Sequence, residues 1–101
     1  MEHLQNLKII VTAAASGLGS EIATTLSTSG SQVYICDNNE AALENFSKKN
    51  PLIKCALADV SNEVQMKKFF SKIENEFGEI DVLINNAGIS GPSSRLEDID
   101  L

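Results

Sequence analysis

Thr12-Ala13-Ala14-Ala15-Ser16-Gly17-Leu18-Gly19 is the stretch that decides the fold of this 101-residue chain. It directly follows the apolar run Lys8-Ile9-Ile10-Val11 and opens a helical pattern of apolar residues at Leu18, Ile22, Ala23 and Leu26. A strand that turns through small residues into a helix presents free backbone N–H groups and the positive end of the helix dipole. Small side chains also let the backbone approach a pyrophosphate. The stretch therefore predicts a phosphate-binding turn.

Strand-like and helix-like segments alternate outward from this turn. The pattern predicts strands over residues 7–11, 32–36, 53–57 and 80–84, and helices over residues 17–29, 40–48 and 62–77, the last capped by Ser61 and ended by Gly78. Short connections between alternating elements imply a parallel sheet with helices on both faces and right-handed crossovers. We expect one α/β domain over residues 1–101, a partial Rossmann-type doubly wound sheet whose first four strands lie in the order 3-2-1-4.

The composition excludes several classes of protein. A net charge of −6 argues against nucleic acid or an anionic membrane as the main partner. No apolar run nears the ~20 residues of a membrane span, and the first residues lack the order of a signal peptide. Cys36 and Cys55 each lie in an apolar strand-like run without C-x-x-C spacing, which indicates reduced core cysteines. We expect a cytoplasmic protein without a metal site.

Asp37 ends the second predicted strand, about 20 residues after the small-residue turn. A carboxylate at this place accepts hydrogen bonds from the adenosine ribose hydroxyls of a bound dinucleotide. It would repel a 2′-phosphate, and neither Asn38 nor Asn39 offers a compensating cation. Asp37 therefore predicts NAD as the cofactor. The alternative is that Asp37 only starts a turn with the two asparagines.

Polar residues also follow the third and fourth predicted strands. Asp59-Val60 ends the third, where the acid can face the amino group of an adenine ring and the backbone can face the ring nitrogens. Alternatively, Asp59 only favours the start of the next helix. Asn85-Asn86-Ala87-Gly88 ends the fourth strand. Its amides can tie neighbouring loops together, and its small residues leave the backbone bare beside a ligand, but an ordinary Asn-rich turn explains the local pattern equally well.

Taken together, these segments resemble the N-terminal portion of a short-chain dehydrogenase/reductase (SDR). The resemblance rests on residues 12–19, Asp37, Asp59-Val60 and the run Gly78-Glu79-Ile80-Asp81-Val82-Leu83 leading into Asn85 to Gly88, and so covers nearly the whole chain. It implies that Asn85 supports the sheet. It also implies cofactor-binding roles for Thr12, Ser16, Gly17, Leu18, Gly19, Asp37, Asp59, Val60, Asn86, Ala87 and Gly88.

The chain departs from the family's pattern in two respects. Ala13 stands where the family usually has glycine, so its methyl group can crowd a tight turn. The family's catalytic Ser, Tyr-x-x-x-Lys pair and further Asn also have no counterpart, because the only tyrosine is Tyr34 and Asn38 stands four residues later. We therefore expect no catalytic residue in these 101 residues. We expect a segment that stops before the family's catalytic part, as a truncated gene product, a partial reading frame or a deliberately shortened protein.

The resemblance implies the N-terminal half of an NAD-dependent oxidoreductase. The complete enzyme would move a hydride between nicotinamide and an alcohol or carbonyl substrate and would form a homo-oligomer. One alternative is a non-catalytic dinucleotide-binding module or a decayed relative. Another is a methyltransferase of similar doubly wound fold, against which Asn85 to Gly88 argues. A P-loop enzyme is excluded by the missing Gly-Lys-Ser/Thr.

Overall fold

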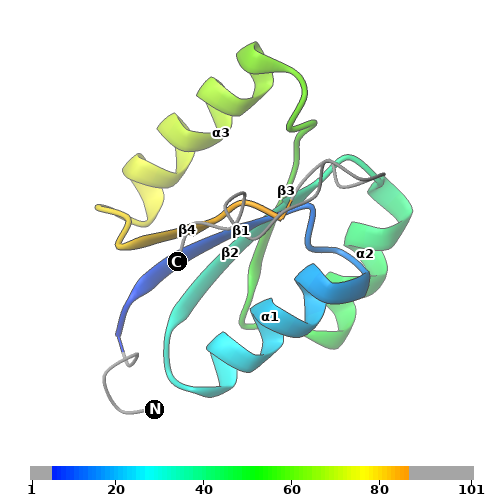
Figure 1. Ribbon diagram of the computed structural model, residues 1–101, viewed down its shortest axis with the longest axis vertical. Coiled ribbons are helices and arrows are strands. Elements are labelled where there is room, and N and C mark those ends of the chain that lie inside the picture. The colour runs from blue at the N-terminus through cyan, green and yellow to red at the C-terminus, as the bar shows by residue number, and fades with distance from the viewer. Residues whose placement is uncertain (1–5, 87–101) are drawn as a thin grey trace.

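Strands and helices alternate along residues 6–86, the part of the chain that the computed structural model describes (Figure 1). The elements in chain order are β1 (Lys8–Thr12), α1 (Gly17–Thr28), β2 (Gln32–Asp37), α2 (Glu40–Lys49), β3 (Lys54–Leu57), α3 (Glu63–Glu76) and β4 (Val82–Ile84). All three strand pairings are parallel, and the sheet order is β3-β2-β1-β4. The predicted fold class and strand order are confirmed.

The helices cover both faces of the sheet, with α1 and α2 on one side and α3 on the other (Figure 1). Alternation along each strand divides the core accordingly, because successive side chains of a strand point to opposite faces. Ile9 and Ile35 are buried against α1 and α2, whereas Ile10 and Tyr34 are buried against α3. Both faces of β1 and β2 are therefore inside the molecule, which explains their continuous apolar runs.

Tyr34 joins β2 to α3. Its ring makes edge-to-face contacts with Phe69 and Phe77, with ring centroids 5.6 and 5.8 Å apart. Its hydroxyl donates a hydrogen bond to Glu76 Oε2 at 3.2 Å. Burial, together with the negative charge of Glu76, raises the pKa of Tyr34 to about 12. The only tyrosine of the chain is thus a core residue of the α3 face.

The two cysteines are free, and they lie on opposite faces of the sheet. Cys36 is fully buried against α3, and burial raises the pKa of its thiol to about 11. Cys55 is half-buried on the α1 and α2 side. A disulfide between them is therefore excluded by the direction of the strands' side chains.

Several predicted boundaries differ from the structure by one or two residues, and two of these differences have a clear physical cause. The cap of α3 is Asn62 rather than Ser61, because the Ser61 backbone N–H and hydroxyl both donate to Asp59 Oδ1, while Asn62 Oδ1 accepts the Gln65 N–H. The fourth strand begins at Val82 rather than at residue 80. Asp81 precedes it and exchanges hydrogen bonds with the Lys8 backbone, which sets the start of pairing with β1.

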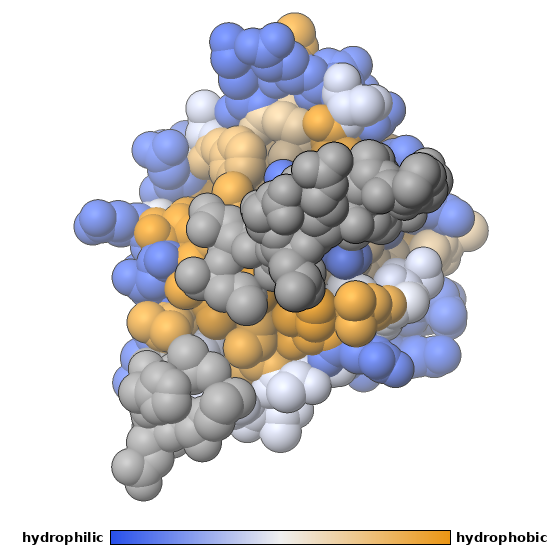
Figure 2. All heavy atoms as spheres, in the orientation of Figure 1, coloured by the Kyte–Doolittle hydropathy of each residue, from blue (hydrophilic) through white to orange (hydrophobic). Residues whose placement is uncertain are grey.

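The β4 side of the molecule shows a band of hydrophobic residues between hydrophilic ends (Figure 2). Within residues 6–86, no helix has both the length and the hydrophobicity to cross a membrane. The same residues contain no cluster of His, Cys, Asp or Glu that could hold a metal ion.

Candidate dinucleotide-binding site

The turn between β1 and α1 leaves the start of α1 without a side-chain cap. Ser16 is the N-cap residue in extended backbone, but its hydroxyl makes no capping hydrogen bond, and the first turn holds no acidic residue. By contrast, α2 and α3 each have an asparagine cap and a glutamate in the first turn. The first N–H groups of α1 and its positive dipole end are therefore left for an external anion.

Two glycines give this turn its shape. Gly17 has a φ of +63°, the left-handed region in which residues with a Cβ are strained. Gly19 lies so close to its neighbours that a Cβ there would stand 2.5 Å from Asn86 Nδ2 and 2.8 Å from the Ala13 carbonyl oxygen. Glycine at position 19 thus allows α1 to pack against the ends of β1 and β4.

Ala13 occupies an unusual backbone conformation for a residue with a side chain. Its φ is +52°, which places it in the left-handed region next to the strand end. Its carbonyl oxygen accepts a hydrogen bond from Asn86 Nδ2 at 3.2 Å, which holds the peptide in place. The methyl group that the sequence flagged therefore sits on a strained residue at the centre of the site.

Thr12 connects β1 to the end of β4. It is 3% exposed, and its hydroxyl donates to Asn85 Oδ1 at 3.0 Å while accepting the Asn86 backbone N–H at 3.0 Å. Together with the bond from Asn86 Nδ2 to Ala13, this network fixes the two strand ends side by side. The Thr12 hydroxyl is used within the protein, so a direct contribution to a cofactor stays a prediction.

Asp37 ties the end of β2 to the small-residue turn. Its Oδ2 accepts the Ala15 N–H at 3.0 Å, and its Oδ1 accepts the Asn39 N–H at 3.0 Å. The bond from Asn39 is the turn role considered as the alternative. A carboxylate has about four acceptor sites in all, so each oxygen can accept one more hydrogen bond. The structural role and the expected ribose contact are therefore compatible.

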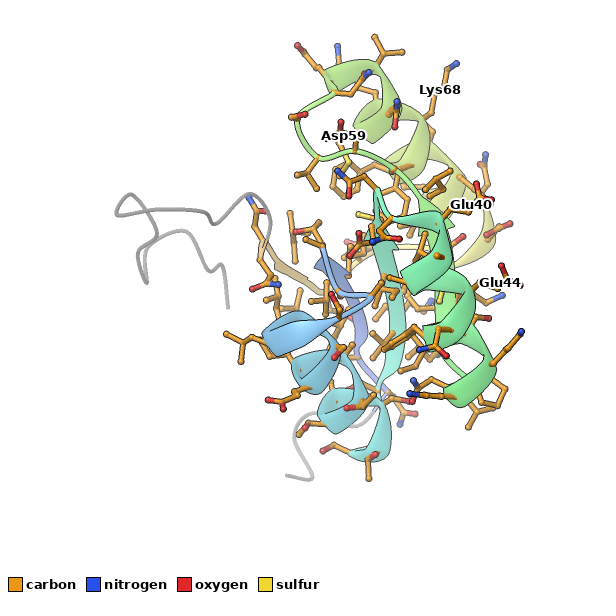
Figure 3. The ribbon with its side chains drawn as sticks, turned by 90° about the vertical axis from the view of Figure 1, so that its right-hand side faces the viewer. Glu40, Glu44, Asp59 and Lys68 are labelled. Atoms are coloured by element: carbon orange, nitrogen blue, oxygen red, sulfur yellow. The ribbon has the colours of Figure 1, made fainter. Side chains whose placement is uncertain are left out.

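Asp59 lies on the loop between β3 and α3. This loop is at the end of the molecule where α2 begins, and Glu40 is the first residue of α2 (Figure 3). Asp59 Oδ1 accepts hydrogen bonds from the Ser61 hydroxyl at 2.6 Å and the Ser61 N–H at 2.9 Å. These bonds hold the pKa of Asp59 below its usual range. The side chain is an ionised acceptor at neutral pH.

A pocket of about 280 Å³ lies where these segments meet. Its volume approaches the ~300–1,000 Å³ of small-molecule sites. Asp37 and Asp59 face it from neighbouring strand ends, and Ala13 connects it to the small-residue turn. It is lined by Ala13, Asp37, Asn38, Ala58, Asp59, Val60 and Ser61.

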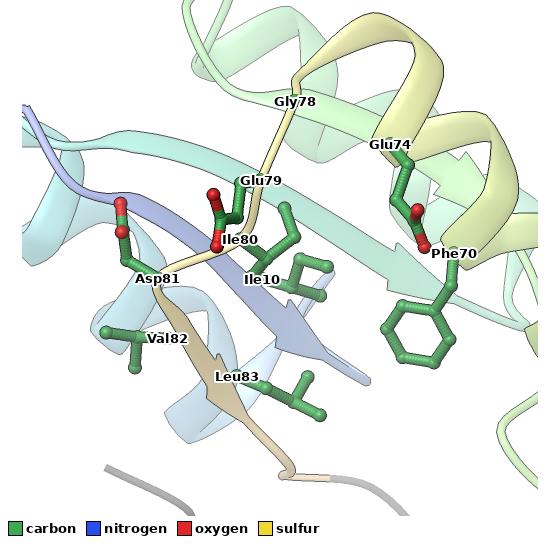
Figure 4. Close-up of a pocket in the computed structure, with 9 residues that line it drawn as sticks. All are labelled: Ile10, Phe70, Glu74, Gly78, Glu79, Ile80, Asp81, Val82 and Leu83. Atoms are coloured by element: carbon green, nitrogen blue, oxygen red, sulfur yellow. The ribbon is translucent and has the colours of Figure 1, made fainter.

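A larger hollow of about 650 Å³ lies elsewhere, between α3 and β4 (Figure 4). Its lining combines the apolar side chains of Ile10, Phe70 and Leu83 with the carboxylates of Glu74 and Glu79. None of the predicted site residues lines it. The chemistry expected of a dinucleotide site is therefore concentrated in the smaller pocket.

Comparison with known proteins agrees with this geometry. The family model for short chain dehydrogenases matches residues 7–100. The chain belongs to the short-chain dehydrogenase family. This membership rules out the methyltransferase alternative.

The individual relatives in the short-chain dehydrogenase family are longer than this chain. It is 35% identical to a 3beta-hydroxysteroid dehydrogenase of Mediterraneibacter gnavus over 91% of this chain and 35% of that protein. It is 38% identical to an L-fucose dehydrogenase of Oryctolagus cuniculus over 89% of this chain and 32% of that protein. The chain thus spans about a third of the length of these curated relatives.

Solved structures show the same fold. A short chain dehydrogenase from Bacillus anthracis superposes with a TM-score of 0.77 at 30% identity, covering 84% of this chain and 36% of that one. A 2-keto-3-deoxy-D-gluconate dehydrogenase from Streptococcus agalactiae gives a TM-score of 0.78 at 28% identity, covering 93% of this chain and 37% of that one.

The structure brings the predicted residues of this short-chain dehydrogenase chain into two adjoining groups. One group surrounds the start of α1 and contains Thr12, Ser16, Gly17, Leu18, Gly19 and Asn86. The other lines the pocket and contains Asp37, Asp59 and Val60. Leu18 is 60% exposed at the start of α1. Ala87 and Gly88 lie outside the described residues, so their predicted roles stay predictions.

The sequence did not predict two groups that hold the aspartates of the pocket in place. One is the Ala15 backbone N–H, which binds Asp37 and carries no sequence signal of its own. The other is Gln65, whose Oε1 accepts the Asp59 N–H at 2.9 Å. The spacing Asn62-Glu63-Val64-Gln65 is a capping-box pattern, and it could have directed attention to Gln65.

Proposed function

We propose that this chain binds NAD and forms the cofactor-binding part of an oxidoreductase acting on an alcohol or carbonyl substrate. Membership of the short-chain dehydrogenase family and relatives named as dehydrogenases support the reaction class. When bound, the nicotinamide ring supplies the hydride chemistry. The residues of this chain hold and orient the other end of the dinucleotide, and the complete enzyme is proposed to be a homo-oligomer.

The observation that carries this proposal is the pairing of an uncapped helix start with an acid-lined pocket. The N–H groups at Gly17, Leu18 and Gly19 fit a pyrophosphate, because no side chain or acidic residue occupies the first turn of α1. The pocket fits an adenosine, with Asp37 toward the ribose hydroxyls and Asp59 toward the adenine amino group. These residues therefore fit the cofactor that the family implies.

The choice of NAD over NADP follows from charge. The residues that line the pocket include two carboxylates and neither lysine nor arginine. A 2′-phosphate placed beside Asp37 would meet repulsion without a compensating cation, whereas ribose hydroxyls can donate to the carboxylate.

A non-catalytic dinucleotide-binding module is the second candidate. Tyr34, the only tyrosine, is buried with its hydroxyl bonded to Glu76 and its pKa raised to about 12, so it cannot serve as a catalytic acid. For the enzyme, we place the family's Ser, Tyr-x-x-x-Lys and further Asn outside these 101 residues. Both candidates bind the dinucleotide in the same way, and the isolated 101 residues are expected to be inactive.

Fluorescence titration with NADH and NADPH tests cofactor choice. The variant Asp37→Asn with Asn38→Arg keeps an acceptor oxygen for the Ala15 N–H, removes the charge and adds a phosphate partner. We expect the 101-residue chain to prefer NADH and the double variant to shift the ratio of the two Kd values toward NADPH by about 10- to 100-fold.

The control for the added cation is Gln32→Arg, at the amino end of β2 and away from the pocket. It should leave the cofactor preference unchanged. An unchanged preference in the double variant would refute the assignment of Asp37 to the ribose.

A further inference from the structure

The first turn of α3 departs from a closed capping box. Asn62 Oδ1 accepts the Gln65 N–H at 3.0 Å, as expected of an N-cap residue. In a closed box the Gln65 side chain would reach back to the Asn62 N–H. Here the Asn62 N–H donates to the Asp59 carbonyl oxygen at 2.9 Å, and Gln65 Oε1 instead accepts the Asp59 N–H at 2.9 Å.

The side chain of Gln65 helps to hold the loop between β3 and α3, which carries Asp59 and lines the pocket. Through Asn62 and Gln65, the start of α3 engages both the carbonyl and the N–H of Asp59. Ser61 engages Oδ1 of the same residue, while Asp59 Oδ2 makes no hydrogen bond among residues 6–86. Gln65 itself is exposed and does not line the pocket. Its effect on a ligand must therefore pass through Asp59.

We propose that Gln65 is a positioning residue that makes the pocket selective for a 6-amino purine, a role that rests on the proposed dinucleotide function. An ionised carboxylate can only accept hydrogen bonds. Asp59 can thus accept from the exocyclic amino group of adenine but finds no donor in the 6-oxo group of hypoxanthine. This discrimination depends on where Asp59 stands, and Gln65 fixes the backbone from which its side chain projects.

The test compares NADH with its reduced hypoxanthine analogue, in which an oxygen replaces the adenine amino group. Gln65→Met retains the length of the side chain and removes the acceptor, whereas Gln65→Glu retains an acceptor. Gln32→Met makes the same change as Gln65→Met at the other end of the sheet. Each Kd is measured by fluorescence titration on the 101-residue chain, and circular dichroism checks that each variant is folded.

We expect the original chain to bind NADH about tenfold more tightly than the analogue, the difference that one hydrogen bond to a carboxylate provides. Gln65→Met should lower this ratio several-fold, and Gln65→Glu and Gln32→Met should preserve it. Equal weakening of both ligands in Gln65→Met, or a ratio that Gln65→Glu does not preserve, overturns the positioning role while leaving the proposed function intact. Absence of NADH binding by the original chain overturns both.

Discussion

The methyl group of Ala13 raises the conformational free energy of the turn between β1 and α1. With a φ of +52°, Ala13 adopts the left-handed conformation that costs a residue with a Cβ about 1–2 kcal/mol relative to glycine. The hydrogen bond from Asn86 Nδ2 to the Ala13 carbonyl oxygen keeps Ala13 in this strained conformation. The sequence could identify Ala13 as a departure from the family, but the sign of its φ depends on how the turn meets α1.

Replacing Ala13 by glycine should stabilise the protein. Relief of the strain is partly offset by about 0.4–1 kcal/mol of extra entropy in the unfolded chain, which leaves a net gain of about 0.5–1 kcal/mol. The relaxed turn should also bind NADH more tightly. Urea unfolding and NADH titration measure the two effects.

Ala14→Gly is the matched control, because Ala14 is fully buried and its φ is not positive. This change should destabilise the protein through lost packing and added chain entropy. If Ala13→Gly destabilises the protein as much as Ala14→Gly does, the turn is adapted to alanine and the strain assigned to it is wrong.

At the scale of elements, the alternation of strands and helices was predictable because each strand has a short apolar run and each helix an apolar face. The cap of α3 was not. Serine and asparagine are comparable N-caps in isolation, and the choice between Ser61 and Asn62 is made by Asp59, which engages both groups of Ser61. That competition comes from the loop that lines the pocket and has no local sequence signal.

The contact between β2 and α3 predicts a loss of stability in alkali. The pKa of Tyr34 is raised from 10.0 to about 12, so its contribution is fully present below pH 10 and is lost as the pH rises through 12. Because the hydroxyl is only part-buried, solvent screening limits the loss to about 1–2 kcal/mol. Because Tyr34 is the only tyrosine, tyrosinate absorbance reports it alone.

The native chain should titrate near pH 12, and the urea-unfolded chain near pH 10. Tyr34→Phe should remove the tyrosine part of the pH dependence and leave the part due to the two cysteines, because burial raises the pKa of Cys36 from 9.0 to about 11 and also raises the pKa of Cys55. A native titration at pH 10 would show that the hydroxyl is accessible to water and would contradict the packing described for α3.

Over the whole molecule, the candidate site is assembled from three junctions between a strand and a helix and from the end of β4. Parallel strands end at one edge of the sheet, so the sequence alone could place Asp37 and Asp59 near the small-residue turn. It could not reveal that Asp37 bonds the Ala15 N–H or that Gln65 bonds the Asp59 N–H, since backbone groups are the same at every position. The first bond joins the β1–α1 turn to the end of β2, and the second holds the β3–α3 loop, which the bond from the Ala58 N–H to the Asp37 carbonyl oxygen links to β2.

Amide chemical-shift mapping during an NADH titration locates the site most directly, because it reports each backbone N–H separately. We predict that the shifts concentrate at Gly17, Leu18 and Gly19 and in the loops that carry Asp37 and Asp59. Gln32, at the opposite end of the sheet, should remain unchanged. If only the amides of residues around the hollow between α3 and β4 shift, and those at the start of α1 do not, dinucleotide binding at the carboxyl edge of the sheet is contradicted.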